Sequence, residues 1–155
     1  MRIGHGYDAH RFAEGEFCTL CGVRIYCGYG LKGHSDADVP VHALMDAMLG
    51  AAALGDIGRH FPDSDPKYRG ADSMGLLRQV DSMLRDKGYT VVNADVTIVA
   101  QKPRVAKHIE EMRRNLAEAM GIDEDCVNVK ATTEEGMGFT GEELGLAAHA
   151  VVLID

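Results

Sequence analysis

Two side chains near the N-terminus, those of Asp8 and His10, combine metal-binding chemistry with a spacing that brings them together. On an extended backbone, residues two positions apart leave the same face, with Cα atoms roughly 6–7 Å apart. His42 offers a third donor from a segment with helical periodicity. One carboxylate and two imidazoles suit Zn²⁺ and leave its fourth position open, as in catalytic zinc sites. Spacing alone leaves a second interpretation open, a solvated polar face beside an ordinary helix histidine.

Asp46 favours the zinc interpretation, because it follows His42 by one helical turn on the same face. A carboxylate there can bind the second ring nitrogen of a metal-ligating histidine and fix its tautomer. The alternative is an exposed polar residue without a partner. We therefore predict Asp46 as a supporting residue behind the metal ligands.

The pattern of apolar and turn-forming residues predicts the elements that must position these side chains. We expect strands at 1–12, 89–101, 127–132 and 144–154, a β-hairpin at 17–26, and helices at 38–54, 72–87 and 105–120. Segments 28–36 and 55–66 are expected to be loops. This order predicts an α+β fold in one catalytic domain, 1–155. It should have a single mixed β-sheet with helices packed on one face, plus a small β-hairpin.

Composition narrows the functional classes. The net charge of −8 argues against a nucleic-acid partner, because nucleic acid needs a basic surface. An anionic substrate would need local neutralisation, which metal ions provide. No apolar run reaches the length of a membrane span, and the N-terminus has no apolar signal core, so we expect a cytoplasmic protein with no membrane partner. The four cysteines are expected to be reduced packing residues.

Other polar residues give no comparable signal. Residues 107–114 are interpreted as a solvated helix face of mixed charge, not a binding patch. Four histidines without an evident partner are interpreted as surface or packing residues: His5, His60, His108 and His149.

The motif Gly4-His5-Gly6-Tyr7-Asp8-Ala9-His10 opens a series of unusual blocks that continues along nearly the whole chain. The others are 34–39, 42–47, 50–58, 61–65, 100–104, 128–135 and 138–141. In order, spacing and composition, these blocks resemble the 2-C-methyl-D-erythritol 2,4-cyclodiphosphate synthase family.

The resemblance implies a metal-dependent phosphorus–oxygen lyase of non-mevalonate isoprenoid biosynthesis. Its substrate would be 4-diphosphocytidyl-2-C-methyl-D-erythritol 2-phosphate. The 2-phosphate attacks the β-phosphorus, CMP leaves, and 2-C-methyl-D-erythritol 2,4-cyclodiphosphate forms. The nucleophile belongs to the substrate and is already ionised, so positioning and charge neutralisation matter more than a nucleophilic side chain.

The resemblance also implies roles for individual residues. By the family pattern, Asp8, His10 and His42 hold Zn²⁺, and Glu135 holds a second divalent cation, Mg²⁺ or Mn²⁺. The implied catalytic residues, which contact the attacking phosphate and align the phosphates, are His34 and Thr133. The implied substrate contacts are Asp8, His10, His34, Ser35, Asp56, Ile57, Gly58, Phe61, Pro62, Asp63, Ser64, Asp65, Ala100, Gln101, Lys102, Pro103, Arg104, Val105, Ala106, Ala131, Thr132, Thr133, Glu134, Glu135 and Phe139.

The family pattern further implies a homotrimer in which one subunit brings the zinc half of each active site and its neighbour brings the cytidine half. The chain departs from the pattern at Gly136, Glu142 and Leu144. In the family these positions border a cavity on the trimer axis, and Glu142 would repel an isoprenoid diphosphate there. Two rivals remain: a metal-dependent phosphohydrolase acting on a nucleotide diphosphate ester, and a non-catalytic metal-binding trimer.

Overall fold

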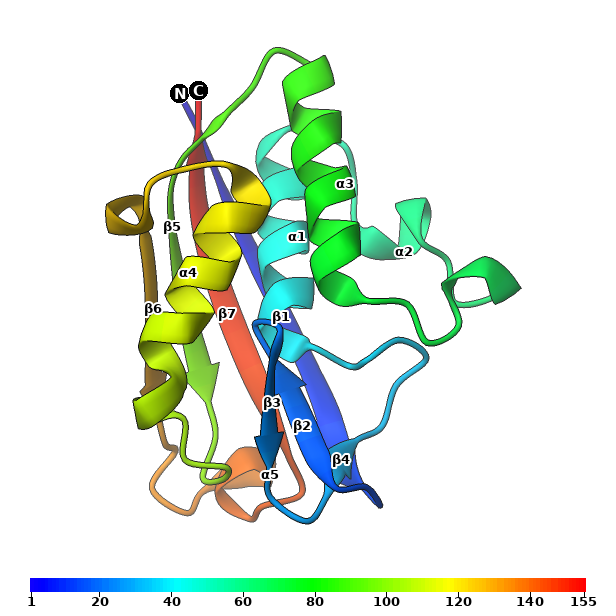
Figure 1. The fold of residues 1–155 in the computed structure, drawn as a ribbon, viewed down its shortest axis with the longest axis vertical. Helices are drawn as coiled ribbons and strands as arrows, with labels where there is room; N and C mark the ends of the chain where they lie inside the picture. The colour runs from blue at the N-terminus through cyan, green and yellow to red at the C-terminus, as the bar shows by residue number, and fades with distance from the viewer.

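The main sheet has five strands in the order β4-β1-β7-β5-β6, as the computed structural model of residues 1–155 shows (Figure 1). Its strands are β1 (Arg2–Ala13), β4 (Gly30–Leu31), β5 (Val91–Val99), β6 (Val127–Thr132) and β7 (Gly145–Ile154). The β5–β6 pair is parallel and the other pairs are antiparallel, so the predicted mixed sheet is confirmed. The predicted hairpin forms a separate sheet from β2 (Phe17–Leu20) and β3 (Val23–Tyr26).

Three long helices cover one face of this sheet, as predicted (Figure 1). They are α1 (Val39–Ala51), α3 (Ser73–Asp86) and α4 (Ile109–Met120). Helix α1 lies against β1, β7 and β5, and α3 packs against both α1 and α4. No helix has both the length and the apolar character that crossing a membrane requires.

The segments predicted as loops contain short elements that periodicity did not indicate. Strand β4 pairs with the end of β1, and the single-turn helix α2 (Ile57–His60) and 3₁₀ helix η1 (Pro66–Tyr68) follow α1. The remaining short elements are η2 (Ala106–His108), η3 (Glu124–Cys126) and α5 (Gly138–Gly141). Elements of one turn depend on caps and tertiary contacts, because they are too short to show a hydrophobic period.

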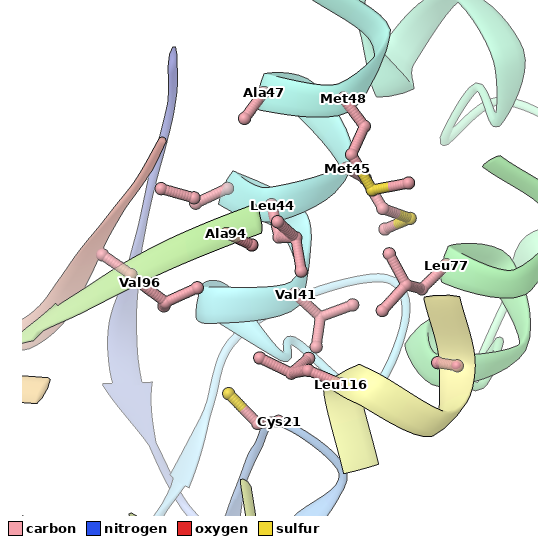
Figure 2. Packing of buried hydrophobic residues seen from close by; sticks show 14 of the residues in the cluster. Cys21, Val41, Leu44, Met45, Ala47, Met48, Leu77, Ala94, Val96 and Leu116 are labelled. Carbon is pink, nitrogen blue, oxygen red and sulfur yellow. The ribbon is translucent and has the colours of Figure 1, made fainter. Parts of the chain in front are cut away.

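The core is one cluster of 39 buried residues between the sheet and the helices. Figure 2 shows part of this cluster. Helix α1 is buried on almost all sides, because the sheet lies on one side of it and α3 on the other. No helix covers the second face of the sheet. Ile3, Tyr7 and Val151 lie on that face and keep 72%, 46% and 39% of their surface exposed.

Gly4 and Gly6 let β1 lie directly on α1. A Cβ atom built on Gly4 would come within 1.9 Å of the Ala47 carbonyl oxygen, and one on Gly6 within 1.8 Å of the Ala43 carbonyl oxygen. Any side chain at these positions would push strand and helix apart. The glycines therefore fix the distance between the two elements that carry the candidate ligands.

A pair of glycine substitutions tests this close approach. We expect Gly6→Ala to lower the free energy of unfolding by about 3 kcal/mol, because backbone rather than a flexible side chain blocks the new methyl group. Gly50→Ala, in α1 with no atom within 4 Å of its Cβ position, should raise it by about 0.5–1 kcal/mol. Urea denaturation measures both changes. Equal effects of the two substitutions would contradict the packing argument.

Candidate metal centre and substrate cavities

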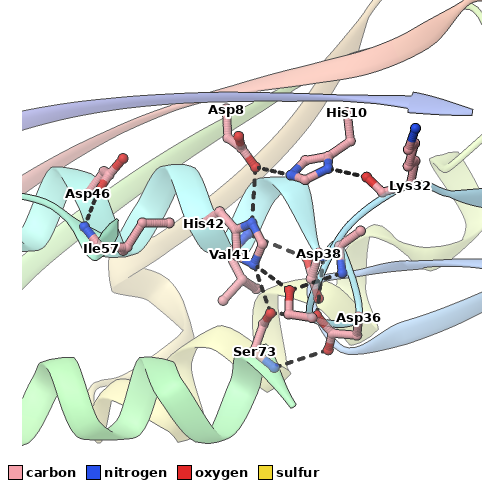
Figure 3. Close-up of polar contacts among 12 residues, drawn as sticks. Asp8, His10, Lys32, Asp36, Asp38, Val41, His42, Asp46, Ile57 and Ser73 are labelled. Carbon is pink, nitrogen blue, oxygen red and sulfur yellow. Dashed lines mark hydrogen bonds and ion pairs between the residues drawn. The ribbon is translucent and has the colours of Figure 1, made fainter. Parts of the chain in front are cut away.

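The three predicted ligands meet where β1 crosses the start of α1 (Figure 3). Asp8 and His10 leave the helix-covered face of β1, and His42 lies in the first turns of α1. The Oδ2 atom of Asp8 is 3.1 Å from Nε2 of His10 and 3.0 Å from Nδ1 of His42. One donor atom from each residue lies within 4.8 Å of the others, and His42 is buried. The geometry is that of a group able to hold one metal ion.

A backbone carbonyl fixes the tautomer of His10. Its Nδ1 atom lies 2.5 Å from the carbonyl oxygen of Lys32. Because a carbonyl oxygen only accepts hydrogen bonds, Nδ1 must carry the proton. The neutral ring therefore directs the lone pair of Nε2 toward Asp8.

A serine and an aspartate fix the tautomer of His42. Its Nε2 atom lies 3.0 Å from Oγ of Ser73 and 3.2 Å from Oγ of Ser35. The Ser73 hydroxyl donates its own hydrogen to Asp36, so Ser73 Oγ is left to accept from Nε2–H of His42. The lone pair of Nδ1 consequently faces Asp8.

These two tautomers create a demand for positive charge. Two neutral rings would direct lone pairs at one carboxylate oxygen, which is repulsive unless a cation lies between them or the rings take up protons. Burial alone would raise the pKa of Asp8, but the two rings, when protonated, donate hydrogen bonds to Asp8 that lower its pKa to about 2. The hydrogen bond to Asp8 raises the pKa of His10. One carboxylate and two correctly oriented imidazoles fit a divalent ion such as Zn²⁺.

A cavity of about 680 Å³ opens beside this group. Many residues that the sequence predicts as substrate contacts line it. They are Asp8, His10, His34, Ser35, Ile57, Gly58, Phe61 and Asp63. The strand, the glycine-rich segment and the segment after α1 thus converge on the metal ligands. The lining adds Ala9, Lys32 and Gly33, which were not predicted.

A second cavity of about 680 Å³ lies where β5 and β6 end. Because these strands are parallel, the segments that follow them meet at one edge of the sheet. The predicted residues that line this cavity are Ala100, Gln101, Pro103, Arg104, Val105, Ala106, Ala131, Thr132 and Thr133. Ile109, Glu110 and Lys130 also line it and were not predicted. The two cavities share no lining residue.

A known protein family matches this chain over residues 1–155, and it is described as the YgbB family. The chain belongs to the YgbB family. A protein from Ectopseudomonas mendocina named 2-C-methyl-D-erythritol 2,4-cyclodiphosphate synthase is 62% identical, over 99% of this chain and 98% of its own. A protein of the same name from Methylococcus capsulatus is 63% identical over the same shares.

Two solved structures contain the same fold. The bifunctional IspDF from Campylobacter jejuni matches with a TM-score of 0.95 and 43% identity, over 99% of this chain and 42% of that longer one. A 2C-methyl-D-erythritol-2,4-cyclodiphosphate synthase in its CDP-bound form matches with a TM-score of 0.91 and 36% identity, over 99% and 100% of the two chains. These likenesses support the α+β arrangement.

The prediction for Asp46 in this YgbB member is wrong. Its Oδ1 atom accepts a hydrogen bond of 2.8 Å from the backbone N–H of Ile57, and burial raises its pKa. Ser73 already occupies the ring nitrogen of His42 that Asp46 was expected to bind. Asp46 instead anchors α2, whose first two residues line the metal cavity.

Several predicted substrate contacts of this YgbB chain line neither cavity. Asp56 caps α2 through Arg59 N–H and Asp65 caps η1 through Lys67 N–H. Lys102 forms an ion pair of 2.8 Å with Glu143. The others outside both linings are Pro62, Ser64, Glu134, Glu135 and Phe139. The last three follow β6, where Glu134 accepts a hydrogen bond from Thr140.

Three of the unassigned histidines do have partners. Nε2 of His5 lies 3.1 Å from Nδ1 of His149 on the uncovered face of the sheet. His60 donates from Nε2 to the carbonyl oxygen of Leu54, 2.9 Å away. Strand parity predicts only the face from which His5 points. The partners of these histidines lie elsewhere in the sequence, so a local pattern does not reveal them.

Replacing Ser73 tests the tautomer argument. Ser73→Ala removes the acceptor of Nε2–H, so we expect about 10–100-fold weaker zinc affinity, as when other supporting partners of metal-ligating histidines are lost. Competition with a zinc chelator measures the affinity. Ser82→Ala, at an exposed position of the same helix, should leave it unchanged. Unaltered affinity in a folded Ser73→Ala variant would contradict the argument.

Proposed function

We propose that this chain, as one catalytic unit of residues 1–155, is a cyclodiphosphate synthase. It converts 4-diphosphocytidyl-2-C-methyl-D-erythritol 2-phosphate to 2-C-methyl-D-erythritol 2,4-cyclodiphosphate and releases CMP, as a lyase of non-mevalonate isoprenoid biosynthesis. The observation that carries the proposal is the Asp8–His10–His42 group opening into a cavity with His34 and Ser35. The names of relatives that are 62–63% identical over nearly their whole length support it.

Asp8, His10 and His42 are assigned to Zn²⁺, and Glu135 to a second divalent cation, Mg²⁺ or Mn²⁺. Bound cations neutralise phosphate charge and orient the reacting oxygens. Support for the zinc assignment comes from the donor set and the fixed tautomers. Glu135 is exposed and adopts φ 55°, a conformation rare for a residue with a side chain and concentrated at functional sites.

Residues of the metal cavity position the attacking phosphate. The 2-phosphate oxygen forms a bond to the β-phosphorus, and the bond from that phosphorus to the bridging oxygen breaks, so CMP leaves with the electron pair. His34 and the Ser35 hydroxyl can donate hydrogen bonds to the attacking phosphate. Ile57, Gly58 and Phe61 shape the side of the cavity assigned to methylerythritol.

The second cavity is assigned to the cytidine. The side-chain oxygen of Gln101 is buried there without a hydrogen-bond partner. Such an acceptor would be satisfied by an amino group, which cytosine carries. Thr133 lines this cavity, and its Oγ1 atom accepts a hydrogen bond of 3.3 Å from the N–H of Glu135. Thr133 is therefore assigned to aligning the phosphates between nucleotide and metal.

The assembly assigned to this activity is a homotrimer with active sites between subunits. The metal half and the nucleotide half occupy separate cavities of one chain, so a neighbour can complete each site. The uncovered sheet face offers exposed apolar side chains for association. Closed cyclic symmetry repeats one such contact around an axis.

Removing a metal ligand tests the function. His42→Ala and Asp8→Asn should lose bound zinc and lower CMP release by about 100-fold or more, because phosphate charge is no longer neutralised. Asp86→Asn, at the exposed end of α3, should retain both. Metal analysis and product separation measure the outcome. Linear phosphates instead of a cyclic diphosphate would establish a phosphohydrolase, and wild-type turnover in His42→Ala would overturn the assignment.

Mixing two inactive variants tests the shared site. Asp8→Ala disables the metal half and Glu135→Ala the nucleotide half. If neighbouring subunits complete each site, refolding the two together in equal amounts should restore about a quarter of wild-type CMP release, because one interface in four pairs two intact halves. No recovery in a mixed trimer verified by mass spectrometry would show that each subunit holds a whole site.

A further inference from the structure

A third cavity, of about 480 Å³, lies between β3 and the η2 turn, apart from the metal ligands. Four basic side chains line it, from Arg24, Arg104, Lys107 and His108, and no carboxylate does. The chain has 24 acidic and 16 basic residues, so composition does not account for this concentration of positive charge. The fold creates it by bringing the hairpin against the segment before α4.

The cations around this third cavity have no carboxylate partner. Arg24, Arg104 and Lys107 take part in none of the ion pairs of the structure. The guanidinium of Arg24 lies 4.8 Å from the ring centroid of Phe17, and both residues also line a neighbouring cavity that contains Glu14 and Glu16. Unpaired like charges around one cavity raise its positive potential and favour an anion.

The rest of the lining is apolar and aromatic. Ile25 and Pro103 are buried. Tyr26 keeps 70% of its surface exposed, and the centroid of its ring lies 5.4 Å from that of Phe17. An apolar floor below a basic rim suits a ligand with an anionic group and a flat or apolar body. The volume lies within the range of small-molecule sites.

We propose that the third cavity is a second anion site, which binds a small molecule carrying a diphosphate group. Arg24, Arg104 and Lys107 neutralise the diphosphate, and Tyr26 offers a face for an attached ring. Pro103 and Arg104 also line the nucleotide cavity, so the two sites share a wall.

From the sequence, residues 107–114 were expected to form one solvated helix face. In the structure, Lys107 and His108 are not part of that helix. Lys107 and His108 belong to η2, whereas α4 begins at Ile109. They line the third cavity, while Arg113 and Arg114 form ion pairs with Glu110 and Glu124. The basic rim therefore depends on a turn that a helical pattern does not show.

A residue-resolved NMR titration of the zinc-loaded enzyme tests the site, with pyrophosphate as the first probe and ADP as the second. We expect saturable shifts of the backbone amides of 24–27 and 107–108, separate from any shifts around the metal ligands. Lys107→Glu should weaken the binding reported by these amides about tenfold or more, because it replaces a charged partner of the anion with a repelling one. Lys107→Arg should preserve the affinity, as should Lys87→Glu at the exposed end of α3.

Tighter binding of ADP than of pyrophosphate identifies a nucleoside diphosphate as the ligand, and equal binding identifies the free diphosphate group.

Several results would overturn the second anion site. These are absent shifts at 24–27 and 107–108, an unchanged affinity in Lys107→Glu, or equal weakening by Lys87→Glu, which would indicate only the net charge of the protein. Far-ultraviolet circular dichroism confirms that each variant is folded. Assays of CMP release on the same samples keep the two proposals apart, since Lys107 lines neither the metal cavity nor the nucleotide cavity and its replacement should leave turnover intact.

Discussion

One carboxylate oxygen, Oδ2 of Asp8, faces two imidazole nitrogens about 3 Å away, and the rest of the site depends on that arrangement. Each ring is held from behind in the tautomer that directs a lone pair inward. Lys32 holds His10, and Ser73, itself bound to Asp36, holds His42. Such a group is stable only around positive charge, so the fold is built to retain a cation at this point.

Several elements of the fold position the three candidate ligands. The glycines of β1 let the strand lie directly on α1. Because α1 is buried on almost all sides, the side chain of His42 has few conformations open to it. Ser73, at the start of α3, contacts the His42 ring on the side away from Asp8. Asp46, on the same helix as His42, accepts a hydrogen bond from the backbone N–H of Ile57 and so holds α2 beside the cavity that it lines. The second cavity forms where the parallel strands β5 and β6 end together.

Local sequence patterns were sufficient to predict the candidate metal ligands, but not the residues that hydrogen-bond to the two histidine rings. Strand parity joined Asp8 to His10, and helical periodicity placed His42, because both depend on near neighbours in the chain. Ser73 and Asp36 lie on other segments, so the sequence favoured the nearer Asp46, which binds Ile57 instead. The mixed sheet and long helices followed from periodicity, whereas β4, α2 and the basic third cavity arise from contacts between distant segments.

Anomalous diffraction at the zinc edge, on crystals of the zinc-replete enzyme, tests the central claim most directly. We expect one peak bonded to a carboxylate oxygen of Asp8, Nε2 of His10 and Nδ1 of His42, at roughly 2.0–2.2 Å. A peak elsewhere, no peak at this group, or coordination through the opposite nitrogen of either ring would contradict the claim that its backing hydrogen bonds build a metal site.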